Sequence, residues 1–142
     1  MQTGWAGPGD GPLVLVCDDT EAIRRLLRIN LELGGFRVEE AADGHEAMSR
    51  LIDADRERPA VIVLDSQMAP YDGWWAIAAI RSHHPLDDVP VVLVTATATD
   101  LESPEVSGAG FDAYVSKPFD PDDLVAVVSR LAAAGRARHR RP

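Results

Sequence analysis

The chain has 142 residues, 46% of them hydrophobic, and a formal net charge of -9. This length suits one domain that can bury its own core, and the hydrophobic share excludes disorder of the whole chain. The acidic balance argues against a general nucleic-acid binder.

Cys17 is the single cysteine, which excludes an intramolecular disulfide and fits a reducing compartment. No apolar segment approaches the ~20 residues of a membrane span, and the first residues lack the charge and apolar stretch of a signal peptide. We therefore expect a cytoplasmic protein without a membrane partner.

Residues 1–12 are rich in Gly and Pro and predict a loose lead-in to a domain over residues 13–134. The apolar run 13–17 predicts a buried strand. The helix predicted over 20–33 ends at Gly34-Gly35, and residues 36–41 alternate as an edge strand does. Asp43-Gly44 then starts a second helix. The residues that we expect on the inner faces of these two helices are Ile23, Leu26, Leu27, Asn30, Ala47, Met48, Leu51 and Ile52.

Further strands are predicted at 60–64, 91–94 and 113–116, with helices at about 73–82 and 120–134. The last helix should bury Leu124, Val128 and Leu131. The polar stretch 100–107 is broken by Pro104 and predicts a short or mobile fourth helix. Residues 135–142 form a basic, Arg-rich tail that we expect to be solvated. Alternating strands and helices indicate an α/β fold, a doubly wound five-stranded parallel sheet with five helices.

Polar side chains stand where the predicted strands end. Because ligands bind beyond the carboxyl ends of the strands in open α/β sheets, we expect these side chains to converge on one edge. They are Asp18, Asp19, Asp65, Thr95 and Lys117. The three carboxylates can hold a hard cation such as Mg²⁺, Asp65 can attack phosphorus, and Lys117 and Thr95 can meet the charge on the phosphoryl oxygens. The plainer alternative for Asp18-Asp19 is a helix N-cap.

Five segments in this order make the chain resemble a response-regulator receiver domain of two-component signalling: residues 14–19, 64–68, 72–73, 95–96 and 114–119. The resemblance implies a flavodoxin-like topology with strand order 2-1-3-4-5. It also implies that Asp65 is the phosphoacceptor and that Mg²⁺ is held by Asp18, Asp19, Asp65 and the main-chain carbonyl of Gln67. Thr95 and Tyr114 would be the switch residues, although Tyr114 could instead be only a core residue.

The resemblance implies a stand-alone, single-domain response regulator phosphorylated by a sensor histidine kinase or a phosphotransfer protein. Its output would be contact with an unknown protein target, or a phosphorelay, and homodimerisation stays open. One alternative is a constitutive interaction module that phosphorylation does not regulate. Another is an enzyme with an aspartyl-phosphate intermediate. Gln67 argues against the enzyme, because such enzymes commonly carry a general acid-base carboxylate two residues after the nucleophile.

Several features are unusual or open. Ala69 follows Met68 where the family usually has proline, and the Lys117-Pro118 bond is a candidate for the cis form. In the third helix we expect Trp74, Ile77 and Ile80 to face the sheet. Trp75, Ala78 and Ala79 should then face outward, which makes Trp75 a candidate interface residue beside the site. The alternative is two core tryptophans with a bland alanine surface.

Overall fold

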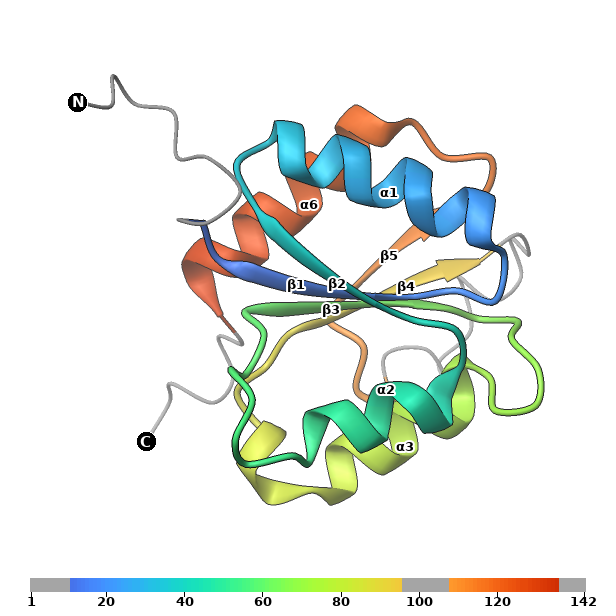
Figure 1. The fold of residues 1–142 in the computed structure, drawn as a ribbon, viewed down its shortest axis with the longest axis vertical. Helices are drawn as coiled ribbons and strands as arrows, with labels where there is room; N and C mark the ends of the chain where they lie inside the picture. Colours follow the sequence, from blue (N-terminus) through green and yellow to red (C-terminus); the bar gives the residue numbers. More distant parts are fainter. Residues whose placement is uncertain (1–10, 96–107, 136–142) are drawn as a thin grey trace.

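Five parallel strands form a single sheet in the computed structural model, which describes residues 11–95 and 108–135. Their order is β2-β1-β3-β4-β5, as the resemblance implies (Figure 1). The strands are β1 Leu13–Cys17, β2 Arg37–Ala41, β3 Val61–Asp65, β4 Val91–Thr95 and β5 Ala113–Ser116. Residues 1–10 and 136–142, which hold most of the predicted lead-in and tail, lie outside the described residues.

Within the described ranges, two helices cover each face of the sheet (Figure 1). One layer holds α1 Glu21–Leu33 and α6 Pro121–Ala134, and the other holds α2 Gly44–Leu51 and α3 Gly73–Ser82. A 3-10 turn, η1 His84–Leu86, follows α3. Residues 11–95 and 108–135 thus contain four α-helices. The fourth helix that we expected over 100–107 lies outside the described residues. Among the described helices we find none with the length and apolarity that a membrane crossing requires.

The three central strands are buried on both faces, and each face has its own side-chain type. Toward α1 and α6 the strands present only valine, namely Val14, Val16, Val61, Val63, Val92 and Val94. Toward α2 and α3 they present mostly larger side chains, namely Leu15, Cys17, Ile62, Leu64, Val91 and Leu93. Because successive strand residues point to opposite faces, this difference follows directly from the alternation in the sequence.

The predicted inner face of α6 is confirmed, since Leu124, Val128 and Leu131 are buried. The predicted face of α1 is partly wrong. Its fully buried residues are Leu27 and Leu31, whereas Leu26 is 42% exposed. Large apolar residues occur nearly all round α1, so spacing alone does not select the stripe that packs. In the second layer Ile52 is 55% exposed, because it follows the last turn of α2 as its C-cap.

Aspartates begin the helices that follow the carboxyl ends of the strands. Asp43 accepts a hydrogen bond from the Glu46 N–H at the start of α2, and Asp72 accepts one from the Trp75 N–H at the start of α3. Both satisfy helix N–H groups that have no partner within the helix. Thr20 occupies the N-cap position of α1, but its side chain makes no capping hydrogen bond.

Gly73 lets the start of α3 lie directly against the end of β3. A Cβ atom at this position would stand 2.5 Å from the carbonyl oxygen of Asp65. The Gly73 N–H also points to the Ser66 carbonyl, at 3.4 Å. The loop over residues 66–72 therefore folds back tightly, which brings Asp72 close to the strand edge.

Gly73→Ala should lower the free energy of unfolding by roughly 1–3 kcal/mol, because the added methyl group forces the backbone of the loop to shift. Urea unfolding measures this change. Gly108→Ala is the matched control, since a Cβ at Gly108 meets no atom within 4 Å. Equal stability of the two variants would contradict the close approach.

Candidate functional site

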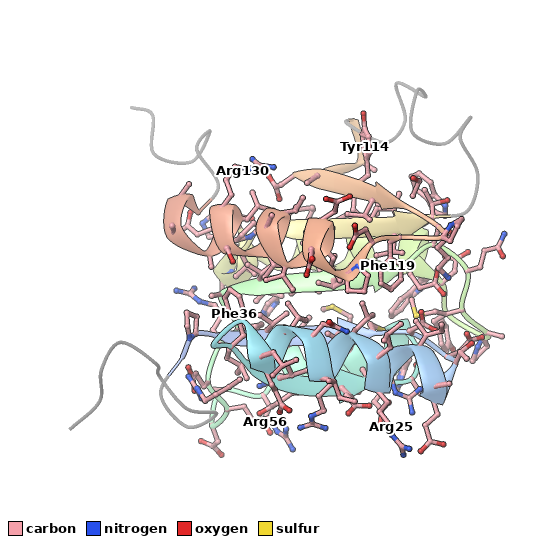
Figure 2. The ribbon with its side chains drawn as sticks, turned by 90° about the horizontal axis from the view of Figure 1, so that it is seen from above. Arg25, Phe36, Arg56, Tyr114, Phe119 and Arg130 are labelled. Atoms are coloured by element: carbon pink, nitrogen blue, oxygen red, sulfur yellow. The ribbon has the colours of Figure 1, made fainter. Side chains whose placement is uncertain are left out.

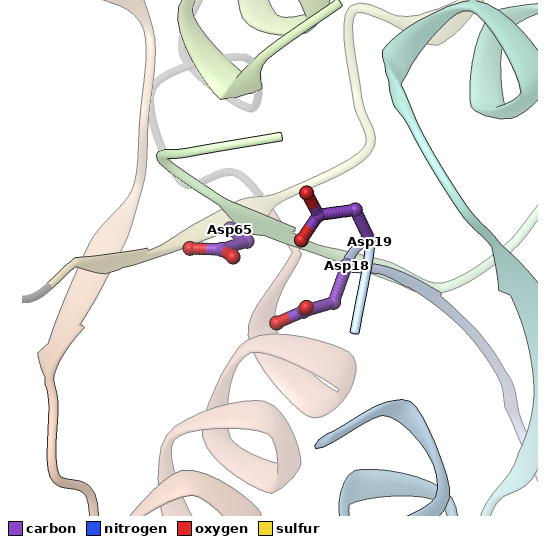
Figure 3. A group of neighbouring side chains, drawn as sticks. All are labelled: Asp18, Asp19 and Asp65. Atoms are coloured by element: carbon purple, nitrogen blue, oxygen red, sulfur yellow. The ribbon is translucent and has the colours of Figure 1, made fainter. Parts of the chain in front are cut away.

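The carboxyl ends of β1 and β3 bring three aspartates together. Asp18 and Asp19 follow β1, and Asp65 is the last residue of β3. One carboxylate oxygen from each of the three lies within 4.8 Å of the others (Figure 3). Thr95 ends the neighbouring strand β4, and Lys117 comes directly after β5. The structure thus gathers the residues that the sequence predicts at this edge of the sheet.

Lys117 is the cation of this cluster. Its Nζ atom lies 3.0 Å from Oδ1 of Asp65 and 4.0 Å from Oδ2 of Asp18. Its backbone N–H donates to the Thr95 carbonyl at 2.8 Å, which fixes the start of the side chain next to β4. The Lys117-Pro118 bond is cis, as the sequence suggested, and so is Ala69-Pro70. Asp65 is 4% exposed, so water screens its attraction to Lys117 only weakly.

Asp18 is held in place by two hydrogen bonds, and its surroundings disfavour its negative charge. Its N–H donates to the Ala41 carbonyl at 3.1 Å, and its Oδ1 accepts from the Thr20 N–H at 2.8 Å. Burial raises the pKa of Asp18 to about 6, and the negative charge of Asp65 adds to this rise, against the opposing effects of the Thr20 hydrogen bond and of Lys117. Negative charge in this cluster therefore exceeds what a single ammonium group compensates.

A divalent cation fits this excess charge. Asp19 is exposed at the edge of an open pocket of about 490 Å³. The pocket is lined by Asp19, Thr20, Asp65, Gln67, Met68, Ala69, Asp72 and Lys117. Carboxylate oxygens are the ligands that hard cations such as Mg²⁺ prefer, and an open pocket leaves room for water ligands. The residues present therefore suit a magnesium ion.

Gln67 lies at this pocket, and its N–H donates to Oδ1 of Asp65 at 3.4 Å. That contact ties the loop after β3 to the carboxylate. Ligation by its main-chain carbonyl stays a prediction.

The two predicted switch residues differ in burial. Thr95 is fully buried at the end of β4. Tyr114 is 46% exposed and projects from β5 away from the body of the protein (Figure 2). The alternative that Tyr114 is only a core residue is therefore wrong. The switch role itself stays a prediction.

Trp75 faces outward, as predicted, and is 39% exposed. Ile77 and Ile80 are buried, while Trp74 is half-buried with its ring edge-on to Phe111 at a centroid distance of 5.5 Å. The Trp75 ring packs against the Tyr71 ring at a centroid distance of 4.7 Å and a tilt of 49°, and the Tyr71 ring packs against that of His45 at 5.3 Å and 33°. The sequence did not reveal this row of rings, because the row runs from α3 through the loop after β3 to α2.

Arg24 is a further residue at the site that sequence reasoning missed. Its guanidinium donates to the main-chain carbonyl of Asp18 at 2.7 Å. In the sequence Arg24 is an ordinary polar position of α1, and only the three-dimensional structure brings it to the edge where the three aspartates meet.

Comparison with known proteins gives a consistent result. The family model described as the response regulator receiver domain matches residues 14–129. The response regulator MprA of Mycolicibacterium vanbaalenii is 42% identical over 120 residues, which cover 83% of this chain and 49% of that protein. The DNA-binding dual master transcriptional regulator RpaA of Synechocystis is 32% identical over 84% of this chain and 48% of its own length. The chain thus spans about half the length of these relatives.

Solved structures agree with the sequence relatives. The receiver domain of Francisella response regulator 1452 superposes with a TM-score of 0.76 at 30% identity, over 87% of this chain and 98% of that one. The chemotaxis response regulator CheY4 of Vibrio cholerae gives a TM-score of 0.76 at 29% identity, over 85% of this chain and 98% of that one. With the strand order, the aspartate cluster and the family match in agreement, this chain belongs to the response-regulator receiver domains.

Proposed function

We propose that this chain is a phosphoryl-accepting switch in which Asp65 takes a phosphoryl group from a histidine of a sensor kinase or a phosphotransfer protein. One observation carries the proposal. The Asp65 carboxylate ends a central strand 3.0 Å from the Lys117 ammonium, and carboxylates of Asp18 and Asp19 lie within 4.8 Å. A nucleophile, a cation and a set of oxygen ligands for a metal therefore stand at one edge.

In the transfer step, a carboxylate oxygen of Asp65 attacks phosphorus. A phosphorus–oxygen bond forms while the phosphorus–nitrogen bond to the donor histidine breaks, and the imidazole nitrogen keeps the electron pair and takes up a proton. Lys117 and the Thr95 hydroxyl meet the charge on the equatorial oxygens. Asp18, Asp19 and the main-chain carbonyl of Gln67 would hold Mg²⁺, which when bound supplies positive charge next to the incoming phosphoryl group.

The response to phosphorylation is proposed to run from Thr95 to Tyr114. Thr95 is paired in register with Ser116, two residues from Tyr114 on the neighbouring strand. If the new phosphoryl group draws the Thr95 hydroxyl toward it, Thr95 leaves room beside β5, and the exposed Tyr114 side chain can turn inward into that room. Phosphorylation then biases an equilibrium between two packings.

The proposed output is contact with another protein, and a homodimer or a phosphorelay remains an alternative form of it. Receiver domains are signalling switches, which agrees with the expectation that no external substrate is turned over. RpaA is DNA-binding by its own description, and this chain spans 48% of it. The expectation that nucleic acid is not a partner of this chain stays a prediction.

Incubation of the protein with Mg²⁺ and a small phosphoryl donor such as acetyl phosphate should give an acid-stable, alkali-labile acyl phosphate. Asp65→Asn should abolish it, because the amide is not a nucleophile toward phosphorus. Mass spectrometry and phosphate-affinity gels measure the labelling. Tryptophan fluorescence with beryllofluoride, a phosphoryl mimic, should respond in the wild type and not in Asp65→Asn.

Asp72→Asn is the matched control for this experiment. Asp72 lines the same pocket, but its carboxylate serves as a helix cap, which asparagine can replace. This variant should label as the wild type does. Saturable Mg²⁺ binding without labelling or a fluorescence response would favour the constitutive interaction module instead.

The raised pKa of Asp18 makes stability depend on pH. The folded protein holds this proton more tightly than the unfolded chain, so the stabilisation from protonated Asp18 is lost as pH rises from 3.8 to about 6. Asn resembles the protonated acid. In chelator, Asp18→Asn should therefore be more stable than the wild type by roughly 2 kcal/mol at pH 7, with the difference vanishing near pH 4.

Urea unfolding across this pH range checks the difference between the two proteins. Millimolar Mg²⁺ at pH 7 should then stabilise the wild type and leave Asp18→Asn nearly unchanged, because only a binder of the folded state shifts the equilibrium. If the wild type were the more stable protein in chelator at every pH, the raised pKa of Asp18 would be contradicted. Equal stabilisation of both proteins by Mg²⁺ would contradict the role of Asp18 as a metal ligand.

The interface hypothesis for Trp75 also stays a prediction. Trp75→Glu should weaken self-association or capture of a partner, because it places a charge within an exposed row of rings. Sedimentation and pull-down with the cognate kinase measure these effects. Leu33→Glu, at a 75% exposed position in the opposite helix layer, is the control. Identical behaviour of Trp75→Glu and the wild type would remove Trp75 from any interface.

A further inference from the structure

Arg24 connects the aspartate cluster to the edge strand β2. Its Nη1 atom donates to the main-chain carbonyl of Asp18 at 2.7 Å, and its Nε atom donates to the Glu40 carboxylate at 3.0 Å. The Arg24 side chain is 17% exposed and that of Glu40 is 25% exposed. A guanidinium group is planar and rigid, so two acceptors at fixed positions determine its orientation.

The carbonyl that Arg24 holds belongs to the peptide that joins Asp18 to Asp19. Because the peptide unit is planar, fixing its oxygen fixes the direction in which the Asp19 main chain continues. Asp18 is restrained independently through the Ala41 carbonyl and the Thr20 N–H. Asp19, in contrast, is exposed, and among residues 11–95 and 108–135 the hydrogen bond to its carboxylate is one of 3.4 Å from the Thr20 hydroxyl. The position of the Asp19 carboxylate thus depends mainly on the peptide plane.

We propose that Arg24 is a positioning residue for the metal-binding pair. It holds the Asp18-Asp19 peptide so that both carboxylates lie close to that of Asp65, and Glu40 orients the guanidinium toward that peptide. This inference rests on the proposed function, since it concerns how the same pocket binds Mg²⁺. It assigns the role to a residue whose hydrogen bonds go to a main-chain carbonyl and to Glu40 and not to the three aspartate carboxylates.

The direction of the change in Mg²⁺ affinity separates a positioning role of Arg24 from a purely electrostatic one. Arg24 carries a positive charge near a site for a dication, so removal of that charge alone should tighten Mg²⁺ binding. Loss of the hold on the peptide should weaken binding, as loss of outer contacts to metal ligands commonly does. We expect Arg24→Gln to bind Mg²⁺ about tenfold more weakly than the wild type.

Arg28 offers a matched control on the same helix. Arg28 also pairs with Glu40, and it donates further hydrogen bonds to Glu32 and to the carbonyl of Val38, the second residue of β2. Arg28→Gln therefore removes the same charge and one hydrogen bond more than Arg24→Gln does, but leaves the Asp18-Asp19 peptide held. Its affinity for Mg²⁺ should equal or slightly exceed that of the wild type.

The experiment is isothermal titration of the full chain with Mg²⁺ for the wild type, Arg24→Gln and Arg28→Gln, together with melting temperatures. Arg24→Lys is added in case Arg24→Gln fails to fold. Lysine keeps the charge but offers one nitrogen in place of two, so this variant should also bind more weakly. Wild-type or tighter Mg²⁺ binding in the folded Arg24 variants would overturn the inference.

A second readout needs no metal. In chelator, the amide signals of Asp19 and Thr20 in heteronuclear NMR spectra should shift in Arg24→Gln and stay in place in Arg28→Gln. Unmoved signals in Arg24→Gln would overturn positioning. If the wild type fails to bind Mg²⁺, the proposed function fails, whereas the NMR result still tests the role of Arg24.

Discussion

The register of the parallel sheet is the constraint on which the rest of this protein depends. Cys17 is paired with Leu64, so the next residues, Asp18 and Asp65, stand beside each other at the strand edge. Asp65 is itself paired with Val94, and Thr95 with Ser116. A slip of one residue between β1 and β3 would separate the two carboxylates by a further residue of strand and dissolve the cluster.

Apolar patterning alone would not prevent such a slip, because the central strands are apolar on both sides. The two faces of the sheet differ in the size of their side chains, and this difference opposes a slip. A slipped strand would put leucine and isoleucine against α1 and α6, where the sheet otherwise presents valine. Such overpacking and the matching voids on the other side are each costly in a dense core. The same packing that stabilises the fold therefore places the chemistry.

The sequence predicted those features that depend on strand ends. Each apolar run stops at a polar residue, and in a parallel sheet all those stops meet, so the convergence of Asp18, Asp65 and Lys117 could be expected. Features that depend on the packing of helices were harder to predict. Leu26 and Leu27 are chemically alike neighbours on α1, and only contact with the sheet decides that one is buried and the other 42% exposed. The bond from Arg24 to Asp18 needs β2 in place beside α1, which spacing along the chain does not reveal.

Gly44 links the start of α2 to the loop that lines the pocket. Its N–H donates to the Tyr71 carbonyl at 2.8 Å, and a Cβ there would lie 3.0 Å from that oxygen and from the Trp75 ring. The first turn of α2 is thus hydrogen-bonded to the far end of the loop that follows Asp65. Opening of this loop exposes the Gly44 amide to solvent, so its hydrogen-exchange rate reports the frequency of loop opening without any added label.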